Sequence, residues 1–244
     1  MAINLRHFQC YEVRPPGSFS RTGISLVDAY GSLTVNLTAA ATVCAPADKN
    51  GEDPDAVTDV WHLTSYQIGV VGPPFDRVKS ISTTNQFGDL TVNLIKPARL
   101  FVPSLKNGSP SGPDMPDHFT CYDIDRTRGT PPFVAQKGVT IVTQFEDAVI
   151  DVVEPIRFCV PTDKNGEGIL SPGGHLMCYR TRGTGSFPPL TVTIDNQFGP
   201  QSWSISQRRE LCVPTTLTSD SDFLEGSTRP AGASGPTRGR GMTR

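Results

Sequence analysis

A motif that begins with histidine and ends with tyrosine recurs four times along the chain. Each copy has the order histidine, apolar residue, any residue, cysteine or serine, tyrosine. The copies begin at His7, His62, His118 and His175 and end at Tyr11, Tyr66, Tyr122 and Tyr179, in steps of 55, 56 and 57 residues. Self-similarity at a nearly fixed period is typical of repeat architectures, so the chain is predicted to contain four copies of one small unit.

Two further blocks keep their order in every copy. An aromatic turn block occupies residues 28–31, 85–88, 143–146 and 196–199. Thirteen residues after each block stands a cysteine or phenylalanine with proline two positions later, at Cys44, Phe101, Cys159 and Cys212. The blocks divide the chain into repeats at residues 1–55, 56–112, 113–169 and 170–215. They leave residues 216–244 as a polar tail that we expect to be disordered.

Apolar and polar residues alternate within each repeat, which is the periodicity of half-buried β-strands. Phe8 and Cys10 share one face of the first predicted strand, and His7, Gln9 and Tyr11 share the other. Three or four short strands are predicted per repeat and no helix, in agreement with 22 prolines in 244 residues. We therefore expect an all-β chain of four tandem, small β-sandwich-like modules. A four-bladed propeller and sheets shared between neighbouring repeats are the alternatives.

The six cysteines occupy only two columns of the repeat, and the second copy lacks both, having Ser65 and Phe101 there. Joint loss is expected if each bridge lies within one repeat, since a bridge between repeats would leave a partner stranded. The predicted disulfides are Cys10–Cys44, Cys121–Cys159 and Cys178–Cys212. Such regular disulfides indicate an oxidising compartment. We expect an extracellular or cell-surface protein whose signal peptide is removed or lies upstream of this sequence.

Composition and motifs argue against several function classes. The formal net charge of −2 argues against nucleic-acid binding, and the absence of any run of 18 apolar residues argues against a membrane span. The sequence has no nucleophile elbow, phosphate-binding glycine loop, dinucleotide fingerprint or zinc-protease motif. Every histidine is a repeat position and every cysteine is assigned to a bridge. No catalytic residue is therefore predicted, and an enzyme is not expected.

The histidine motif is not predicted to bind a metal. Its histidine and cysteine point to opposite faces of a strand, and His62 persists where the cysteine is missing. We expect a repeat surface on the outer face that hydrogen-bonds to a neighbouring strand or module. Its members are His7, Tyr11, His62, Tyr66, His118, Tyr122, His175 and Tyr179.

Two other candidate sites have weaker patterns. Alternating oxygen ligands resemble a calcium loop at two places, Asp48, Asn50, Glu52 and Asp163, Asn165, Glu167. The glycine falls at the wrong position of that loop and no bidentate glutamate follows, so an Asn-Gly turn is favoured and no cofactor is expected. Trp61 precedes a histidine and is a candidate for stacking on a sugar, whereas Trp203 occupies a core column.

The combination of His-x-x-Cys-Tyr, Gln-Phe-Gly and Leu-Cys-Val-Pro-Thr-x-Lys-Asn-Gly resembles a tandem repeat domain of predicted secreted proteins from environmental bacteria. The resemblance covers residues 1 to about 215 and implies an extracellular location without any activity. The leading hypothesis is a non-catalytic secreted or surface protein with a structural, adhesive or assembly role. The expected partners are other copies of the chain, giving a homo-oligomer, or extracellular matrix and glycan. A carbohydrate- or other ligand-binding module is the alternative, and a hydrolase on a β scaffold is the third.

Overall fold

The computed structural model describes residues 5–14, 17–183, 185 and 187–218. It is all-β, as predicted, and each repeat contributes three strands in the same order. The first two repeats give β1 (His7–Arg14), β2 (Arg21–Asp28), β3 (Gly31–Lys49), β4 (Trp61–Val71), β5 (Val78–Asn85) and β6 (Gly88–Lys106). The last two give β7 (His118–Arg126), β8 (Gln136–Val142), β9 (Asp147–Lys164), β10 (His175–Gly183), β11 (Leu190–Asp195) and β12 (Gln201–Leu217). A single turn of 3₁₀ helix, Pro54–Thr58, lies between the first two repeats.

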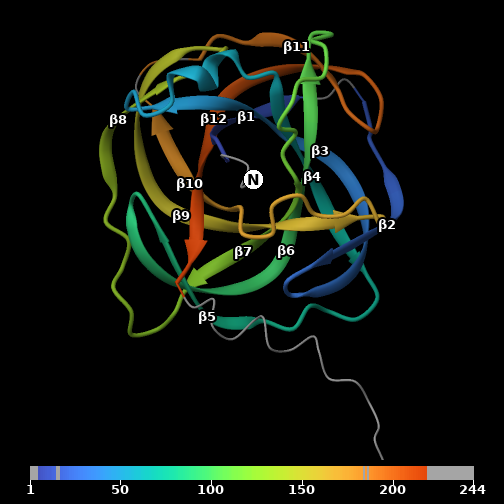
Figure 1. Cartoon of the computed structure of the whole chain (residues 1–244), viewed down its shortest axis with the longest axis vertical. Coiled ribbons are helices and arrows are strands. Elements are labelled where there is room, and N and C mark those ends of the chain that lie inside the picture. The colour runs from blue at the N-terminus through green and yellow to red at the C-terminus, as the bar shows by residue number, and fades with distance from the viewer. Residues whose placement is uncertain (1–4, 15–16, 184, 186, 219–244) are drawn as a thin grey trace, which may run out of the picture.

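The first and third strands of all four repeats close into one antiparallel barrel. Each first strand pairs with the third strand of its own repeat and with the third strand of the preceding repeat. The pairing of β1 with β12 closes the circle, and in Figure 1 the strands surround the middle of the molecule. Separate sandwich modules and a propeller were therefore wrong predictions, because no repeat completes a sheet alone and all the strands belong to one hydrogen-bonded sheet. The alternative of shared sheets is the one that the structure has.

The second strands form hairpins outside the barrel and link repeats that are two apart. Each second strand pairs along its length with the third strand of its own repeat. Its end also pairs with the end of the third strand two repeats away, as Leu26 does with Lys164 and Ile194 with Lys106. The same link joins β5 to β12 and β8 to β3. The four repeats are thus interlocked, and each repeat contacts all the others.

The third strands are single long strands, and two of them contain a proline beside an irregularity in their pairing. Pro97 and Pro155 do not end a strand, since β6 and β9 run through these positions and their pairing registers shift beside both prolines. A β-bulge tolerates proline because the ladder is locally interrupted there and the missing N–H is not needed.

The barrel interior and its outer surface carry separate hydrophobic cores. The interior core contains the six cysteines with Phe8, Leu63, Phe101, Phe119 and Leu176. Two larger clusters lie between the outer face of the barrel and the hairpins, and one of them contains Trp203, which is 1% exposed as its core column predicted. An eight-stranded barrel is just wide enough for side chains to fill, so the interior is a packed core and not a channel.

Candidate functional site

The three disulfides form the middle layer of the barrel interior and have the predicted pairing. They join Cys10 to Cys44, Cys121 to Cys159 and Cys178 to Cys212, and all six cysteines are fully buried. Each bridge joins residues that face each other on neighbouring strands. In the second repeat Phe101 fills the equivalent space, and Ser65 bonds to Thr42 with 2.6 Å between hydroxyl oxygens. The predicted intra-repeat bridging is confirmed.

A ring of eight side chains lies one layer beyond the disulfides, where the first strands end. These residues stand two positions from the cysteine columns and therefore face the same side of each strand. We call them the mouth ring: Glu12, Thr42, Gln67, Arg99, Asp123, Arg157, Arg180 and Glu210. The layers below repeat cysteine, phenylalanine or leucine almost unchanged, whereas the mouth ring differs in every repeat. The fold alone does not require this divergence, which makes the ring the strongest candidate for a functional site.

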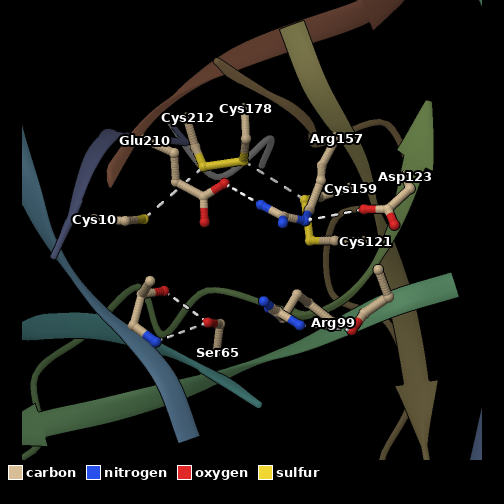
Figure 2. A network of polar contacts seen from close by, with 12 residues as sticks. Cys10, Ser65, Arg99, Cys121, Asp123, Arg157, Cys159, Cys178, Glu210 and Cys212 are labelled. Carbon is tan, nitrogen blue, oxygen red and sulfur yellow. Dashed lines mark hydrogen bonds and ion pairs between the residues drawn. A yellow bond between two sulfur atoms is a disulfide. The ribbon is translucent and has the colours of Figure 1, made fainter. Parts of the chain in front are cut away.

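A charged network crosses one half of the ring. The guanidinium of Arg157 donates to Oε2 of Glu210 at 2.5 Å, and its Nε lies 3.4 Å from Oδ1 of Asp123 (Figure 2). The Glu210 side chain is only 2% exposed, and that of Arg157 is 17% exposed. Asp123 also lies 3.8 Å from the ammonium of Lys96. Arg157 is therefore compensated by two carboxylates, of which Glu210 is buried and Asp123 is partly exposed.

Arg99 lies beside this network without a carboxylate of its own. Among the described residues its one hydrogen bond is to the carbonyl of the adjacent Ala98, at 3.3 Å, and no acid lies within 4.0 Å. Figure 2 shows its guanidinium pointing into the space below Arg157. Burial and, secondarily, the positive charge of Arg157 lower the pKa of Arg99. The half-buried guanidinium thus has no carboxylate in direct contact, although the charges of Glu210 and Asp123 act in the opposite direction and favour its charged form.

The mouth opens into a large, open cavity. Its volume is about 990 Å³, and its lining includes seven members of the mouth ring, all except Asp123. An adjoining cavity of about 490 Å³ shares Gln67, Arg99 and Arg157 with it and adds Asp123. Cavities of this size hold small organic ligands in other proteins. The mouth ring therefore lines a space that a ligand of several functional groups can enter.

The tyrosines of the repeated motif hold the repeats together and are not a free surface. Tyr122 donates to Oδ2 of Asp28 at 2.7 Å, and the other three tyrosine hydroxyls bond to the equivalent turn residues, Thr143, Asn196 and Asn85. All four lie at most 1% exposed on the outer side of the barrel, beneath the hairpins. The expected hydrogen bonds to other modules are present, but the expected exposed surface is absent because the hairpins cover it.

The histidines have structural environments at the opposite end of the barrel. His7 and His118 contact the side-chain amides of Gln86 and Gln197, each in the next repeat. His62 donates from Nδ1 to the carbonyl of Val60, and burial lowers its pKa to about 4. Burial, with the nearby charge of Lys164, also lowers the pKa of His118 to about 4. These imidazoles are therefore neutral at pH 7.

The two calcium-like loops are turns that fasten one repeat to another. Oδ1 of Asn50 accepts the N–H of Thr140 at 3.0 Å, and Oδ1 of Asn165 accepts that of Ser25 at 2.9 Å. Each asparagine and the glycine after it have positive φ, as an Asn-Gly turn requires.

The acidic side chains of these loops are engaged within the loops themselves. Asp48 and Asp163 accept backbone N–H groups five residues on, while Glu52 and Glu167 pair with Lys49 and Lys164. No group of three or more potential metal-binding side chains occurs among the described residues. The turn interpretation accounts for all six loop residues.

Trp61 is not the exposed platform that a sugar-stacking role needs. It is 9% exposed, and its indole N–H donates to the carbonyls of Gly112 and Pro113 at 3.1 and 3.0 Å. Its edge lines a cavity of about 300 Å³ at the histidine end, together with Leu5, Arg6 and Phe8.

The predicted disordered tail, residues 216–244, begins too early by two residues, because β12 extends to Leu217. Residues 219–244 lie outside the described residues.

No family model, curated protein or solved structure matches this chain. Within the described ranges, no helix is long and apolar enough to cross a membrane. The site must therefore be judged on its own geometry. Sequence reasoning missed the mouth ring, although a signal was present: the residues two positions from each cysteine column differ between repeats that otherwise agree.

Proposed function

We propose that the protein is a non-catalytic ligand-binding module whose site is the cavity bounded by the mouth ring. The observation that carries the proposal is the contrast between layers of one barrel. The disulfide layer is nearly identical from repeat to repeat, and the mouth ring has eight polar side chains with no repeating pattern. A scaffold of repeated residues that holds one unlike set of polar groups resembles the usual design of a binding site on a rigid fold.

The mouth offers groups that are free to receive a ligand. Among the described residues, the Gln67 side chain makes no hydrogen bond, and Arg14, Arg99 and Arg182 have no acidic partner. The surrounding sheet is closed and carries disulfides just below the ring, so these side chains start from a rigid base. A rigid backbone limits the entropy lost on ligand binding to that of the side chains themselves.

Ligand binding replaces structural assembly as the leading hypothesis for a specific reason. Addition of strands between copies needs exposed sheet edges, and the closure of the barrel pairs both edges of all eight of its strands. The edges that remain belong to the short hairpin strands β2, β5, β8 and β11, and the end of each is already paired with another repeat. The three fully buried disulfides support a location outside reducing compartments, which agrees with the secreted, extracellular role expected from the sequence.

The test compares ligand binding to the wild-type chain with binding to a variant whose mouth is filled. A panel of neutral, cationic and anionic small molecules is screened by isothermal titration calorimetry. Gln67→Trp places a bulky ring at the mouth, and because Gln67 is exposed the substitution does not disturb the core. The control is Ser111→Trp, which makes a similar change on an exposed loop at the opposite end of the barrel. We expect at least one ligand whose affinity falls tenfold or more in Gln67→Trp and stays unchanged in Ser111→Trp. A panel with no such ligand contradicts the proposal.

A further inference from the structure

The lining of the mouth cavity is strongly basic although the chain as a whole is slightly acidic. Two glutamates, Glu12 and Glu210, line the cavity together with seven arginines, and the formal net charge of the chain is −2. The arginines are Arg14, Arg99, Arg157, Arg180, Arg182, Arg208 and Arg209. A concave site lined mainly by one sign of charge concentrates ligands of the opposite sign.

Four of these arginines are already neutralised by carboxylates. Arg157 pairs with Glu210 and Asp123, and the remaining pairs are Arg180–Glu154, Arg208–Glu146 and Arg209–Glu12. Among the described residues, Arg14, Arg99 and Arg182 have no such partner. The positive charge that remains in the cavity therefore belongs to these three side chains.

Arg99 differs from the other two because it is half-buried. Arg14 and Arg182 are exposed and can be solvated by water, whereas Arg99 projects from β6 inside the mouth ring. Its environment already disfavours the charge, as its lowered pKa indicates. A partly desolvated guanidinium without a carboxylate in direct contact is costly. The charges of Glu210 and Asp123 offset part of this cost, and a bound anion in contact with the guanidinium would offset more of it.

The neighbour of Arg99 across the sheet supplies a neutral hydrogen-bonding group. Gln67 on β4 is paired in register with Arg99 and lines both mouth cavities. Its side chain has no hydrogen-bond partner in the described part of the chain. A guanidinium fork beside a free amide suits a ligand that has an oxyanion next to hydroxyl or carbonyl groups.

We propose that the ligand of the mouth cavity is a small molecule with an oxyanion, a carboxylate, phosphate or sulfate, and that Arg99 binds this group. The inference rests on the proposed function, since it concerns the same cavity and names the chemical class of its ligand. Gln67 binds a polar group adjacent to the oxyanion, and Arg14 and Arg182 at the rim attract the anion electrostatically.

The experiment uses sugars that share one frame and differ in their charge. The full chain is titrated with glucose, glucuronate, glucose 6-phosphate and glucose 6-sulfate at constant ionic strength, and with inorganic phosphate alone. The same titrations are made with Arg99→Gln, Arg99→Lys and the control Arg128→Gln. Arg128 is exposed, lines none of the described cavities and has no partner among the described residues, so its substitution makes the same charge change elsewhere.

We expect at least one anionic sugar to bind the wild-type chain ten times more tightly than glucose. Arg99→Gln should weaken that binding at least tenfold, Arg99→Lys by an intermediate factor, and Arg128→Gln by less than twofold. Comparison of the three anionic sugars identifies the preferred oxyanion, and inorganic phosphate shows whether the oxyanion suffices alone. An unchanged near-ultraviolet circular dichroism spectrum establishes that each variant is folded.

The outcomes separate this inference from the proposed function. If a neutral or cationic ligand is blocked by Gln67→Trp while no anion depends on Arg99, the cavity is a binding site and the oxyanion inference is wrong. If anions bind equally well to the wild-type chain, Arg99→Gln and Gln67→Trp, they bind outside the mouth and the inference is again wrong. If no ligand distinguishes Gln67→Trp from Ser111→Trp, both proposals fail.

Discussion

The hydroxyl of Tyr122 donates a 2.7 Å hydrogen bond to the carboxylate of Asp28, although the two residues belong to repeats that are two apart. The aromatic ring of Tyr30, two residues after Asp28, packs edge-on against Tyr122 at 5.7 Å. Equivalent pairs of tyrosine and turn aromatic occur in the other three repeats. Each repeat thus holds the turn of the repeat two positions away, and we expect the barrel and its hairpins to unfold together.

Replacing Asp28 by asparagine should stabilise the protein at neutral pH. Burial raises the pKa of Asp28, and the Tyr122 hydrogen bond acts in the opposite direction. The carboxyl therefore contributes stability below its unfolded pKa of about 4, and this is lost as the pH rises through the folded value. The asparagines at the equivalent turns, Asn85 and Asn196, bond to their tyrosines without a charge.

We expect Asp28→Asn to raise the free energy of unfolding by about 1 kcal/mol at pH 7.5 and to have no advantage at pH 3.5. Urea unfolding at both pH values measures the difference. Asp76→Asn, at an exposed loop position, is the control and should change little at either pH. A destabilised Asp28→Asn at pH 7.5 would show that the charged hydrogen bond outweighs the cost of burying the carboxylate.

His62 should make the protein less stable in mild acid. Burial holds its pKa at about 4 in the folded chain, below the usual histidine value of 6.5. A lowered pKa gives stability that is complete above pH 6.5 and is lost as the pH falls toward 4, by up to about 3 kcal/mol. In His62→Asn the amide can still donate to the Val60 carbonyl but does not titrate. The free energy of unfolding of this variant should fall less steeply between pH 7 and 4.5 than that of the wild type, and an equal slope would contradict the assignment.

The all-β class and the disulfide pairing could be predicted because they depend on columns that recur within one chain. The arrangement of the repeats could not, because strand periodicity does not say which neighbour a strand pairs with. Leu26 and Lys164 are paired although 138 positions separate them in the chain, and no sequence pattern around either residue indicates this pairing. The role of Tyr122 was partly foreseen, as an outer-face hydrogen bond to another module, but its burial depends on hairpins whose placement the sequence does not encode locally.

The mouth ring was missed for a different reason. Arg99 and Arg157 stand in columns without a repeated residue. Alignment of the four repeats with one another detects only the columns in which they share a residue. Once the barrel is known, the alternation of strand faces places these columns directly above the disulfides. The columns that carry no repeat signal then become the informative ones.

The second repeat should accept a fourth disulfide. Ser65 and Phe101 are direct partners across β4 and β6, as the three cysteine pairs are on their own strands. The double variant Ser65→Cys/Phe101→Cys should form the bridge, which non-reducing peptide mapping detects. Loop closure stabilises by about 4 kcal/mol and loss of the buried ring costs about 3–5 kcal/mol, so we expect stability near that of the wild type. Phe101→Ala alone should lose the full about 3–5 kcal/mol, and equal stability of the two variants would show that no effective bridge forms.

The buried ion pair of the mouth ring should be costly to break and cheap to replace. Arg157→Met leaves the Glu210 carboxylate, 2% exposed, without its guanidinium, and we expect a loss of about 3–5 kcal/mol in the free energy of unfolding. Arg157→Met/Glu210→Leu removes both charges and should recover most of that loss, because an apolar pair suits the disulfide layer beneath it. The matched control is Arg77→Met/Asp125→Leu, an ion pair whose side chains are 53% and 51% exposed, where the single and double variants should lie within about 1 kcal/mol of the wild type. Urea unfolding of all variants completes the double-mutant cycle. If the double variant is no more stable than Arg157→Met alone, Glu210 has another partner in the barrel. The assignment of Glu210 as the counter-charge of Arg157, beside Arg99, would then be wrong.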